Sequence, residues 1–318
     1  MSDKNYLIKA EALAFDKRIT ERVNAGFIPD LRRAVECNYF YKSFWRHPQF
    51  IDLYLGKINA NYLRLLRKYS KPAASIIDIG CGAGYMSLEL ARNGYNVRAI
   101  DISAECINSA KEVLKSNPFT DNFGSLEYAV QSLGGAKGSY DVVLFSVSLH
   151  HMTDLDDALN KASGLLKPNG LLLCYEPCHD MWTKADAAQV SLIRGILSIS
   201  GLWYEDLFSD KVLDEDVIDS LTEEIHYEYI HEIDKQETEQ SPNDNESTGA
   251  EMLLALRAKF NQLEFLPGHS FIYRLLGGIR GNIKVISELA EFISAYDRYS
   301  VSHGYLNSNG FYFIGRKN

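Results

Sequence analysis

The chain has 318 residues, a length that suits one elaborated domain or two ordinary ones. Hydrophobic residues make up 46% and charged residues 24%, which excludes the disordered, collagen-like and coiled-coil classes. The net charge of −9 is uneven, because residues 201–251 hold 17 acidic and 2 basic residues and leave the rest of the chain at +6. An acidic block repels phosphate backbones, so nucleic acid is a disfavoured partner.

The cysteine content and the absence of long apolar runs predict the location. Five cysteines are few and odd in number for a disulfide framework, which predicts a reducing, cytoplasmic compartment. No apolar run approaches the roughly 18 residues of a membrane span, and the first residues lack a signal-peptide pattern. We therefore expect no membrane span. The sequence leaves the oligomeric state open, a homodimer included.

The first 70 residues are predicted to form a helical cap. Helical character extends over 6–25 and 31–69, and Pro48 interrupts the second stretch.

Residues 71–180 show the strongest pattern, in which short apolar or β-branched runs alternate with helical stretches. Strands are predicted at 75–79, 96–100, 126–130, 141–146 and 171–175, and helices at 85–93, 104–116 and 155–166. Such alternation with short connections requires crossover units. It predicts a mostly parallel, Rossmann-like α/β sheet that is covered by helices on both faces.

Beyond residue 180 we expect a helical insertion, or lid, at 181–262, and then the strands and helix that complete the sheet at 263–318. Helices are predicted at 182–200, 214–231, 251–260 and 285–296, and strands at 263–265, 271–275 and 310–315, with an antiparallel last strand. Residues 234–249 turn polar and are expected to be a loop or mobile lid segment. Pattern alone leaves a separate domain at 182–260 open. An insertion is favoured because the terminal strand needs a sheet to join.

A glycine-rich turn follows the first predicted strand, in the string DIGCGAG at 78–84. Its glycines allow positive φ and let a ligand approach the backbone at the carboxyl end of the strand. A dinucleotide fingerprint requires the third glycine one residue later. A nicotinamide-dependent oxidoreductase is therefore disfavoured.

Asp101 closes the next strand, 17 residues after Gly84. A carboxylate at a strand end suits the two hydroxyls of a ribose. The alternative is an acid at the N-terminus of the helix that begins at Ala104, where the helix dipole stabilises it. Together with Asp78 and the glycines, the ribose interpretation is favoured.

The string D-x-G-C-G-x-G followed by a strand-end acid resembles the class I S-adenosylmethionine-dependent methyltransferases. The pattern is most similar to their ubiquinone/menaquinone-type and small-molecule branch. Further matches follow in chain order, at YDVVL (140–144), LHHM (149–152), LLKPNG (165–170) and Glu176-Pro177. The resemblance covers roughly residues 70–178 and the terminal strand at 310–316.

This resemblance implies S-adenosyl-L-methionine as the cofactor, S-adenosyl-L-homocysteine as its product, and no metal. The implied contacts, from the amino-acid moiety through ribose and adenine to the methionine portion, are Asp78, Gly80, Cys81 and Gly82; Asp101; Ile102, Gln131 and Ser132; and Ser146 and Val147. Gln131 or Ser132 stands where the family commonly carries an acid that meets the adenine amino group.

Methyl transfer from a sulfonium requires a nucleophile held in line in a site that excludes water. A base is required only when the acceptor is protonated. The candidates are His150 and His151, after the fourth strand, and Glu176, at the end of the fifth. The alternatives are that the histidines cap the next helix or contact the cofactor, and that Glu176 is a structural hydrogen-bond acceptor.

An aromatic segment at 39–46 precedes the core. Tyr39, Tyr41 and Trp45 would roof the cleft against substrate or sulfonium, and Arg46 would pair with a carboxylate. Packing of an N-terminal helix is the alternative.

The sequence thus predicts S-adenosylmethionine-dependent methyl transfer to oxygen or nitrogen of a small or medium organic molecule, by in-line displacement in a lidded cleft. Two alternatives stay open. One is a tRNA, rRNA or protein methyltransferase, and the other is a non-catalytic S-adenosylmethionine-binding module.

Overall fold

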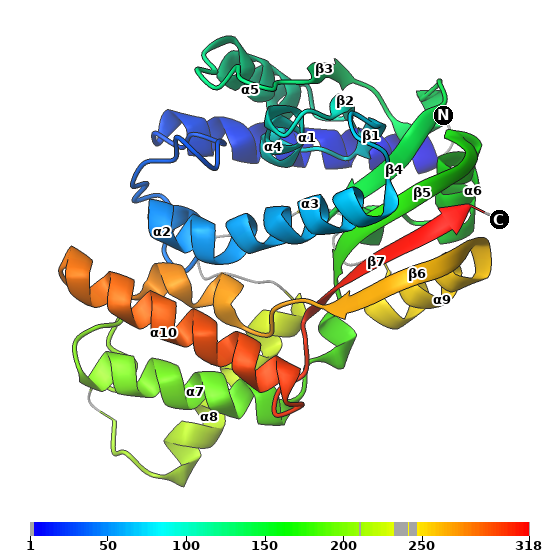
Figure 1. Ribbon diagram of the computed structural model, residues 1–318. Coiled ribbons are helices and arrows are strands. Elements are labelled where there is room, and N and C mark those ends of the chain that lie inside the picture. The colour runs from blue at the N-terminus through cyan, green and yellow to red at the C-terminus, as the bar shows by residue number, and fades with distance from the viewer. Residues whose placement is uncertain (1–2, 210, 232–240, 242–246, 318) are drawn as a thin grey trace.

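The computed structural model describes residues 3–209, 211–231, 241 and 247–317. At its centre is a seven-stranded sheet in the order β3-β2-β1-β4-β5-β7-β6 (Figure 1). The strands are β1 (Ser75–Ile79), β2 (Asn96–Asp101), β3 (Ser125–Val130), β4 (Tyr140–Ser146), β5 (Leu166–Pro177), β6 (Phe260–Pro267) and β7 (Gly310–Lys317). β7 runs antiparallel to β5 and β6, whereas β1 to β5 pair in parallel. The predicted Rossmann-like class I architecture is confirmed.

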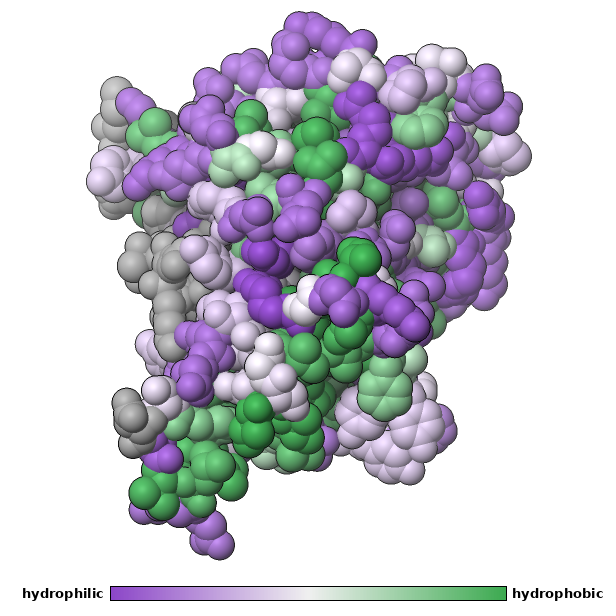
Figure 2. Space-filling view, turned by 90° about the vertical axis from the view of Figure 1, so that its left-hand side faces the viewer, coloured by the Kyte–Doolittle hydropathy of each residue, from purple (hydrophilic) through white to green (hydrophobic). Residues whose placement is uncertain are grey.

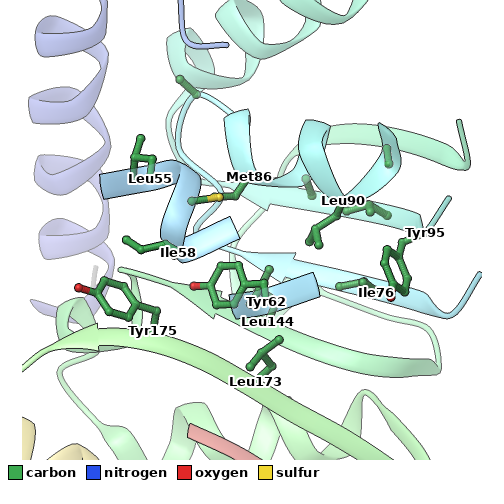
Figure 3. Close-up of a cluster of buried hydrophobic side chains, with 14 of the residues drawn as sticks. Leu55, Ile58, Tyr62, Ile76, Met86, Leu90, Tyr95, Leu144, Leu173 and Tyr175 are labelled. Carbon is green, nitrogen blue, oxygen red and sulfur yellow. The ribbon is translucent and has the colours of Figure 1, made fainter. Parts of the chain in front are cut away.

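Helices cover both faces of the sheet, as the apolar strands require. One face carries α3 (Lys57–Tyr69), α4 (Tyr85–Arg92) and α5 (Ala104–Lys115); the other carries α6 (Leu155–Gly164) and α9 (Gly249–Lys259). Alternate strand residues separate accordingly, so that Ile76 lies in the first core and Ile77 in the second. Figure 3 shows Tyr62 of α3 beside Leu144 of β4 in the first core.

The N-terminal segment begins with α1 (Asp3–Asn24) and continues through η1 (Phe44–Arg46), α2 (Pro48–Ile51) and η2 (Asp52–Gly56) into α3. The predicted helix over 31–69 is wrong in its first part, because residues 34–43 contain no helix. Asp30 explains the difference: its carboxylate accepts from the N–H of Arg32 at 2.9 Å and pairs with Arg92 of α4 at 2.7 Å. These bonds hold the chain as a loop against α4.

A second group of helices has its own core. α7 (Lys184–Ile199), α8 (Glu215–His231) and α10 (Ile283–Ser302) enclose Trp182 and Tyr229, whose rings stack at 4.4 Å. The strand predicted at 271–275 is wrong, since these residues form the turns η6 (Ile272–Arg274) and η7 (Leu276–Gly278). Buried Asp297 of α10 accepts hydrogen bonds from three successive N–H groups there, at residues 270–272, and so fixes a turn.

The helices of the predicted lid segment fall into different layers. α9 packs against α6 on the sheet, while α7 and α8 pack with each other and with α10. The division of the chain at residues 70, 180 and 262 stays a prediction. Of the loop predicted at 234–249, only Ser241 and residues 247–249 lie within the described residues.

The surface carries apolar side chains on this helical group. Leu192, Ile196 and Ile199 of α7 and Phe292 of α10 are each more than half exposed. Figure 2 shows apolar side chains gathered at the lower end of one face, where these helices lie. Among the described residues, no helix is both long and apolar enough to cross a bilayer.

Candidate active site

A cavity of about 380 Å³ lies at the carboxyl ends of β1, β2, β4 and β5. This is the edge at which parallel α/β sheets bind ligands. Its volume is in the usual range for small-molecule pockets. Side chains from α1, η1 and η2 complete the walls, so the cavity is enclosed from the N-terminal side.

The glycine turn after β1 forms one wall. Gly80 and Gly82 have φ of +72° and +52°, as the spacing predicts. A Cβ on Gly80 would lie 2.7 Å from the Cβ of Ser148, so this glycine permits close contact with the turn after β4. A Cβ on Gly82 would meet no protein atom within 4 Å. Gly82 therefore borders open space in the cavity and leaves its backbone accessible to a ligand.

Asp101 closes β2 beside this turn. Its Oδ2 accepts from the N–H of Gly82 and its Oδ1 from the N–H of Ser103, both at 2.8 Å. Each oxygen keeps a second lone pair that is suited to a ligand hydroxyl. Burial raises the pKa of the Asp101 carboxyl, and the two N–H donors oppose that shift. The carboxylate thus joins the glycine turn to the start of α5 and borders the cavity.

Asp78 does not line the cavity, although it belongs to the same motif. It is fully buried, and its Oδ2 accepts from the Ser87 hydroxyl at 2.5 Å. Its Oδ1 has no hydrogen-bond partner among the described residues. Burial raises the pKa of this carboxyl to about 7. A buried carboxyl oxygen without a donor is costly, so a ligand or water donor is required to satisfy it.

The turn after β4 is strained. Val147 has φ of +57°, an unusual conformation for a β-branched residue, and is held by its N–H bond to the Tyr175 carbonyl at 2.9 Å. The Ser148 hydroxyl donates to the Ile79 carbonyl at 2.6 Å. Ser146 accepts from the Tyr62 hydroxyl at 3.1 Å. Ser146, Val147 and Ser148 all line the cavity.

Glu176 fixes the next turn, at residues 148–150. Its buried carboxylate accepts from the N–H groups of Ser148 and Leu149 at 3.1 and 3.0 Å, and Nδ1 of His150 lies 2.8 Å from Oε2. Burial raises the pKa of the Glu176 carboxyl to about 7, although the backbone donors oppose it. Glu176 does not line the cavity, whereas His150 does. Glu176 is therefore placed to orient His150.

His151 lies against α1. Its Nδ1 is 3.1 Å from Oε1 of Glu11, and its ring meets Phe15 edge-on at 5.6 Å. A positive charge on His151 lowers the pKa of Asp101, so the imidazole lies on the Asp101 side of the cavity. Both histidines line the cavity.

The residues predicted near adenine reach the cavity with different freedom. Ile102, Gln131 and Ser132 line it. The Gln131 amide donates to the Gly135 carbonyl at 2.6 Å and accepts from Arg98 at 3.2 Å, so its side chain is held by the protein. Ser132 is the better-placed of the two polar candidates.

The aromatic segment at 39–46 reaches the cavity only in part. Trp45 lines it and contacts Tyr85 edge-on at 5.2 Å. Tyr39, Tyr41 and Arg46 do not line it. The Arg46 guanidinium donates instead to the Phe40 carbonyl at 2.9 Å and to Asn38 at 2.7 Å. These local bonds turn the predicted carboxylate partner away from the site.

Comparison with known proteins identifies the sheet and its site. Residues 77–174 match the family model described as "Methyltransferase domain". The ubiquinone biosynthesis O-methyltransferase of Rickettsia akari is 31% identical over 127 residues, which cover 40% of this chain and 47% of that protein. The enzyme of the same name from Colwellia psychrerythraea is 35% identical over 97 residues, covering 30% and 39%. The chain thus spans less than half the length of these curated relatives.

Solved structures agree on the fold. Magnesium protoporphyrin IX methyltransferase from Synechocystis PCC 6803, with bound S-adenosyl-L-homocysteine, superposes with a TM-score of 0.51 at 14% identity, covering 98% of this chain and 99% of that one. The cyclase SpnF gives 0.52 at 12% identity, covering 98% and 96%. The chain carries a class I methyltransferase domain. The resemblance read from its motifs is confirmed.

S-adenosyl-L-methionine is the cofactor of class I methyltransferase domains, and the residues present here fit it. The backbone at Gly82 faces open space, where a nucleoside amino acid can approach. Asp101 offers lone pairs for ribose hydroxyls, and Asp78 Oδ1 lacks a donor beside the turn. Arg18 and Arg22 of α1 line the cavity and suit the ligand's carboxylate.

Several residues of the methyltransferase domain's cavity escaped the sequence reasoning. One set lies on a single face of α1, at Glu11, Phe15, Arg18, Ile19 and Arg22. Their spacing of four, seven, eight and eleven residues is a helical signal, but it also fits ordinary packing. The other set, at Tyr54, His179, Tyr273 and Asn309, comes from four separate segments, and no local pattern joins them.

Proposed function

We propose that this protein is an S-adenosylmethionine-dependent methyltransferase that acts on oxygen or nitrogen of a small organic molecule. The carrying observation is that Gly82 and Asp101 face the same cavity as a separate set of aromatic and imidazole side chains. One half of the cavity suits a nucleoside amino acid, and the other suits an acceptor. A shared cavity allows the two to meet without crossing solvent.

The reaction asks for position more than for chemical activation. When bound, the sulfonium supplies an activated methyl group. The chain's task is to hold the acceptor in line with that methyl and to remove a proton where the acceptor carries one. His150, oriented by Glu176, and His151, beside Glu11, are the bases that the motif predicts. The wall formed by α1 and η1 helps to exclude water.

Enclosure supports a small acceptor. α1 closes one side of the cavity, and its Asp16 accepts from the Ser103 hydroxyl at 2.6 Å and the Glu105 N–H at 3.0 Å, at the start of α5. A nucleic-acid or protein strand requires an open groove along the surface. The names of the curated relatives favour an oxygen acceptor.

Two measurements test the proposal. Calorimetry with S-adenosyl-L-homocysteine should give one binding site per chain, and radiolabelled methyl should pass from S-adenosyl-L-methionine to a component of pooled small metabolites. Binding without transfer to any pool would favour the binding module. Transfer to bulk tRNA or protein in place of small molecules would favour the macromolecular alternative. Absence of binding would contradict the proposal outright.

A further inference from the structure

The end of the cavity away from Asp101 contains an ordered polar group that the motif-based reasoning leaves without a role. His179 follows β5 in the turn η5 (His179–Met181), and Asn309 directly precedes β7. Nδ1 of His179 lies 3.1 Å from Oδ1 of Asn309. The Asn309 amide donates to the Tyr273 hydroxyl at 3.1 Å. His179, Asn309 and Tyr273 all line the cavity.

This arrangement fixes the tautomer of His179. An amide oxygen accepts and never donates, so Nδ1 facing Oδ1 must carry the hydrogen. In the neutral ring the other nitrogen, Nε2, is then the proton acceptor. Asn309 is itself held firmly, because its N–H donates to the His269 carbonyl at 2.8 Å and its carbonyl accepts from the Cys178 N–H at 3.2 Å. Asn309 therefore orients the imidazole and sets which nitrogen is basic.

The walls around this group are aromatic. The rings of Tyr54 and Tyr273 are stacked at 6.1 Å, with an angle of 26° between them. Phe44 lies 4.6 Å from Tyr54 on another side. The hydroxyls of Tyr54 and Tyr175 lie 3.3 Å apart. Flat apolar walls with a polar group at one end suit a flat ring that bears a proton donor.

The two motif histidines are placed differently. His150 is bound at Nδ1 by Glu176, and His151 lies beside Glu11 and within electrostatic reach of Asp101. Both are thereby associated with the turn after β4 and the Asp101 side of the cavity. His179 stands with Tyr54 and Tyr273, at the aromatic end.

We propose that His179 is the general base of the methyl transfer, and that the acceptor is a flat aromatic ring bearing a hydroxyl. This inference rests on the proposed function. Nε2 of His179 takes the hydroxyl proton as the oxygen lone pair forms the new bond to the methyl carbon. The carbon–sulfur bond breaks with its electron pair remaining on sulfur, which turns from sulfonium to neutral thioether. The imidazolium keeps its Nδ1 bond to Asn309 and releases its proton to water after the product leaves.

Binding of three small probes to the protein loaded with S-adenosyl-L-homocysteine tests the acceptor site. Phenol has the ring and the hydroxyl, toluene has only the ring, and cyclohexanol has only the hydroxyl. A crystal structure should place phenol beside Tyr54 and Tyr273 with its oxygen within hydrogen-bond distance of His179 Nε2. His179→Ala should weaken phenol at least tenfold and leave toluene within about twofold. Phenol bound elsewhere, or no better than cyclohexanol, would overturn the proposal.

Turnover with two phenols tests the base. At pH 8 phenol keeps its proton, whereas 4-nitrophenol is largely ionised and needs no base. His179→Gln should slow methyl transfer to phenol by about 10²–10⁴-fold and transfer to 4-nitrophenol by less than threefold. His303→Gln, at an exposed position, is the matched control and should change neither. Equal slowing of both phenols, no slowing, or no transfer to either phenol by the wild-type protein would overturn the proposal.

Binding of S-adenosyl-L-homocysteine separates this proposal from the one on which it rests. Unchanged affinity in His179→Gln shows that the variant is folded and that its loss concerns the acceptor. Should the wild-type protein bind the product and methylate another class of small molecule, the acceptor assignment fails while the methyltransferase assignment stands.

Discussion

The backbone N–H of Gly82 donates to Oδ2 of Asp101 at 2.8 Å, so the glycine turn after β1 and the carboxylate that ends β2 form one unit. Two strands with parallel neighbours deliver these groups to the same edge of the sheet. A ligand that binds one must therefore meet the other.

Replacing Asp101 should weaken cofactor binding in two steps. Asp101→Ala removes the ribose acceptor and the bond that fixes Gly82, and we expect a loss of about 1–3 kcal/mol, or roughly 5- to 150-fold in the Kd for S-adenosyl-L-homocysteine. Asp101→Asn keeps one acceptor oxygen and should lose less. Calorimetry on both variants measures the effect, and an unchanged Kd in Asp101→Ala would count against the ribose assignment.

A pair of glycine variants separates backbone strain from loss of the ligand's space. Gly82 and Gly304 both have positive φ, at +52° and +70°, and a Cβ on either meets no protein atom within 4 Å. Alanine at each should lower the free energy of unfolding by a similar amount, about 1 kcal/mol, because both backbones are left-handed. Only Gly82→Ala should lose affinity for S-adenosyl-L-homocysteine. Equal affinities in the two variants would place the ligand elsewhere.

Asp78 should make stability depend on pH. Burial raises its pKa to about 7, from 3.8 in the unfolded chain. Between these values the folded state binds more protons than the unfolded state, so its contribution to stability falls as the pH rises and levels off above about 7. Asp78→Asn should remove this slope and be more stable than the wild type at pH 8, by on the order of 1.4 kcal/mol per pKa unit.

Urea unfolding of the wild type and Asp78→Asn at pH 5 and pH 8 tests this expectation. The stability difference between the two proteins should be larger at pH 8. A difference that is independent of pH would show that Asp78 does not titrate in this window.

The attachment of α1 should control how long the cofactor stays bound. Asp16→Ala removes the acceptor for two donors at the start of α5, Ser103 and Glu105. We expect a modest loss of stability, about 1 kcal/mol, and faster dissociation of S-adenosyl-L-homocysteine in stopped-flow experiments. Lys17→Ala, at a highly exposed neighbouring position, is the control. Identical dissociation rates in the two variants would mean that α1 is not a cover.

The sheet was accessible from sequence because its strands are buried on both faces and read as continuous apolar runs between helices. The two errors have a common cause. Residues 271–275 are as apolar as a strand, and residues 34–43 follow a helix-like spacing, yet buried Asp297 and Asp30 impose turns through side-chain bonds. Such bonds join distant segments and leave no periodic signal.

The same reasoning explains which site residues sequence could provide. Asp78, the glycines and Asp101 stand in one short motif whose geometry follows from strand and turn. His179 and Asn309 are 130 residues apart and meet only because β7 pairs with β5. The pairing that brings them together belongs to the tertiary fold, so neither residue could be singled out beforehand.

Titration of the wild-type protein with S-adenosyl-L-homocysteine, beside a parallel titration with NAD, is the most direct measurement. The account predicts saturable binding of the former at one site per chain and none of the latter. A protein that leaves S-adenosyl-L-homocysteine unbound, or prefers NAD, would contradict it.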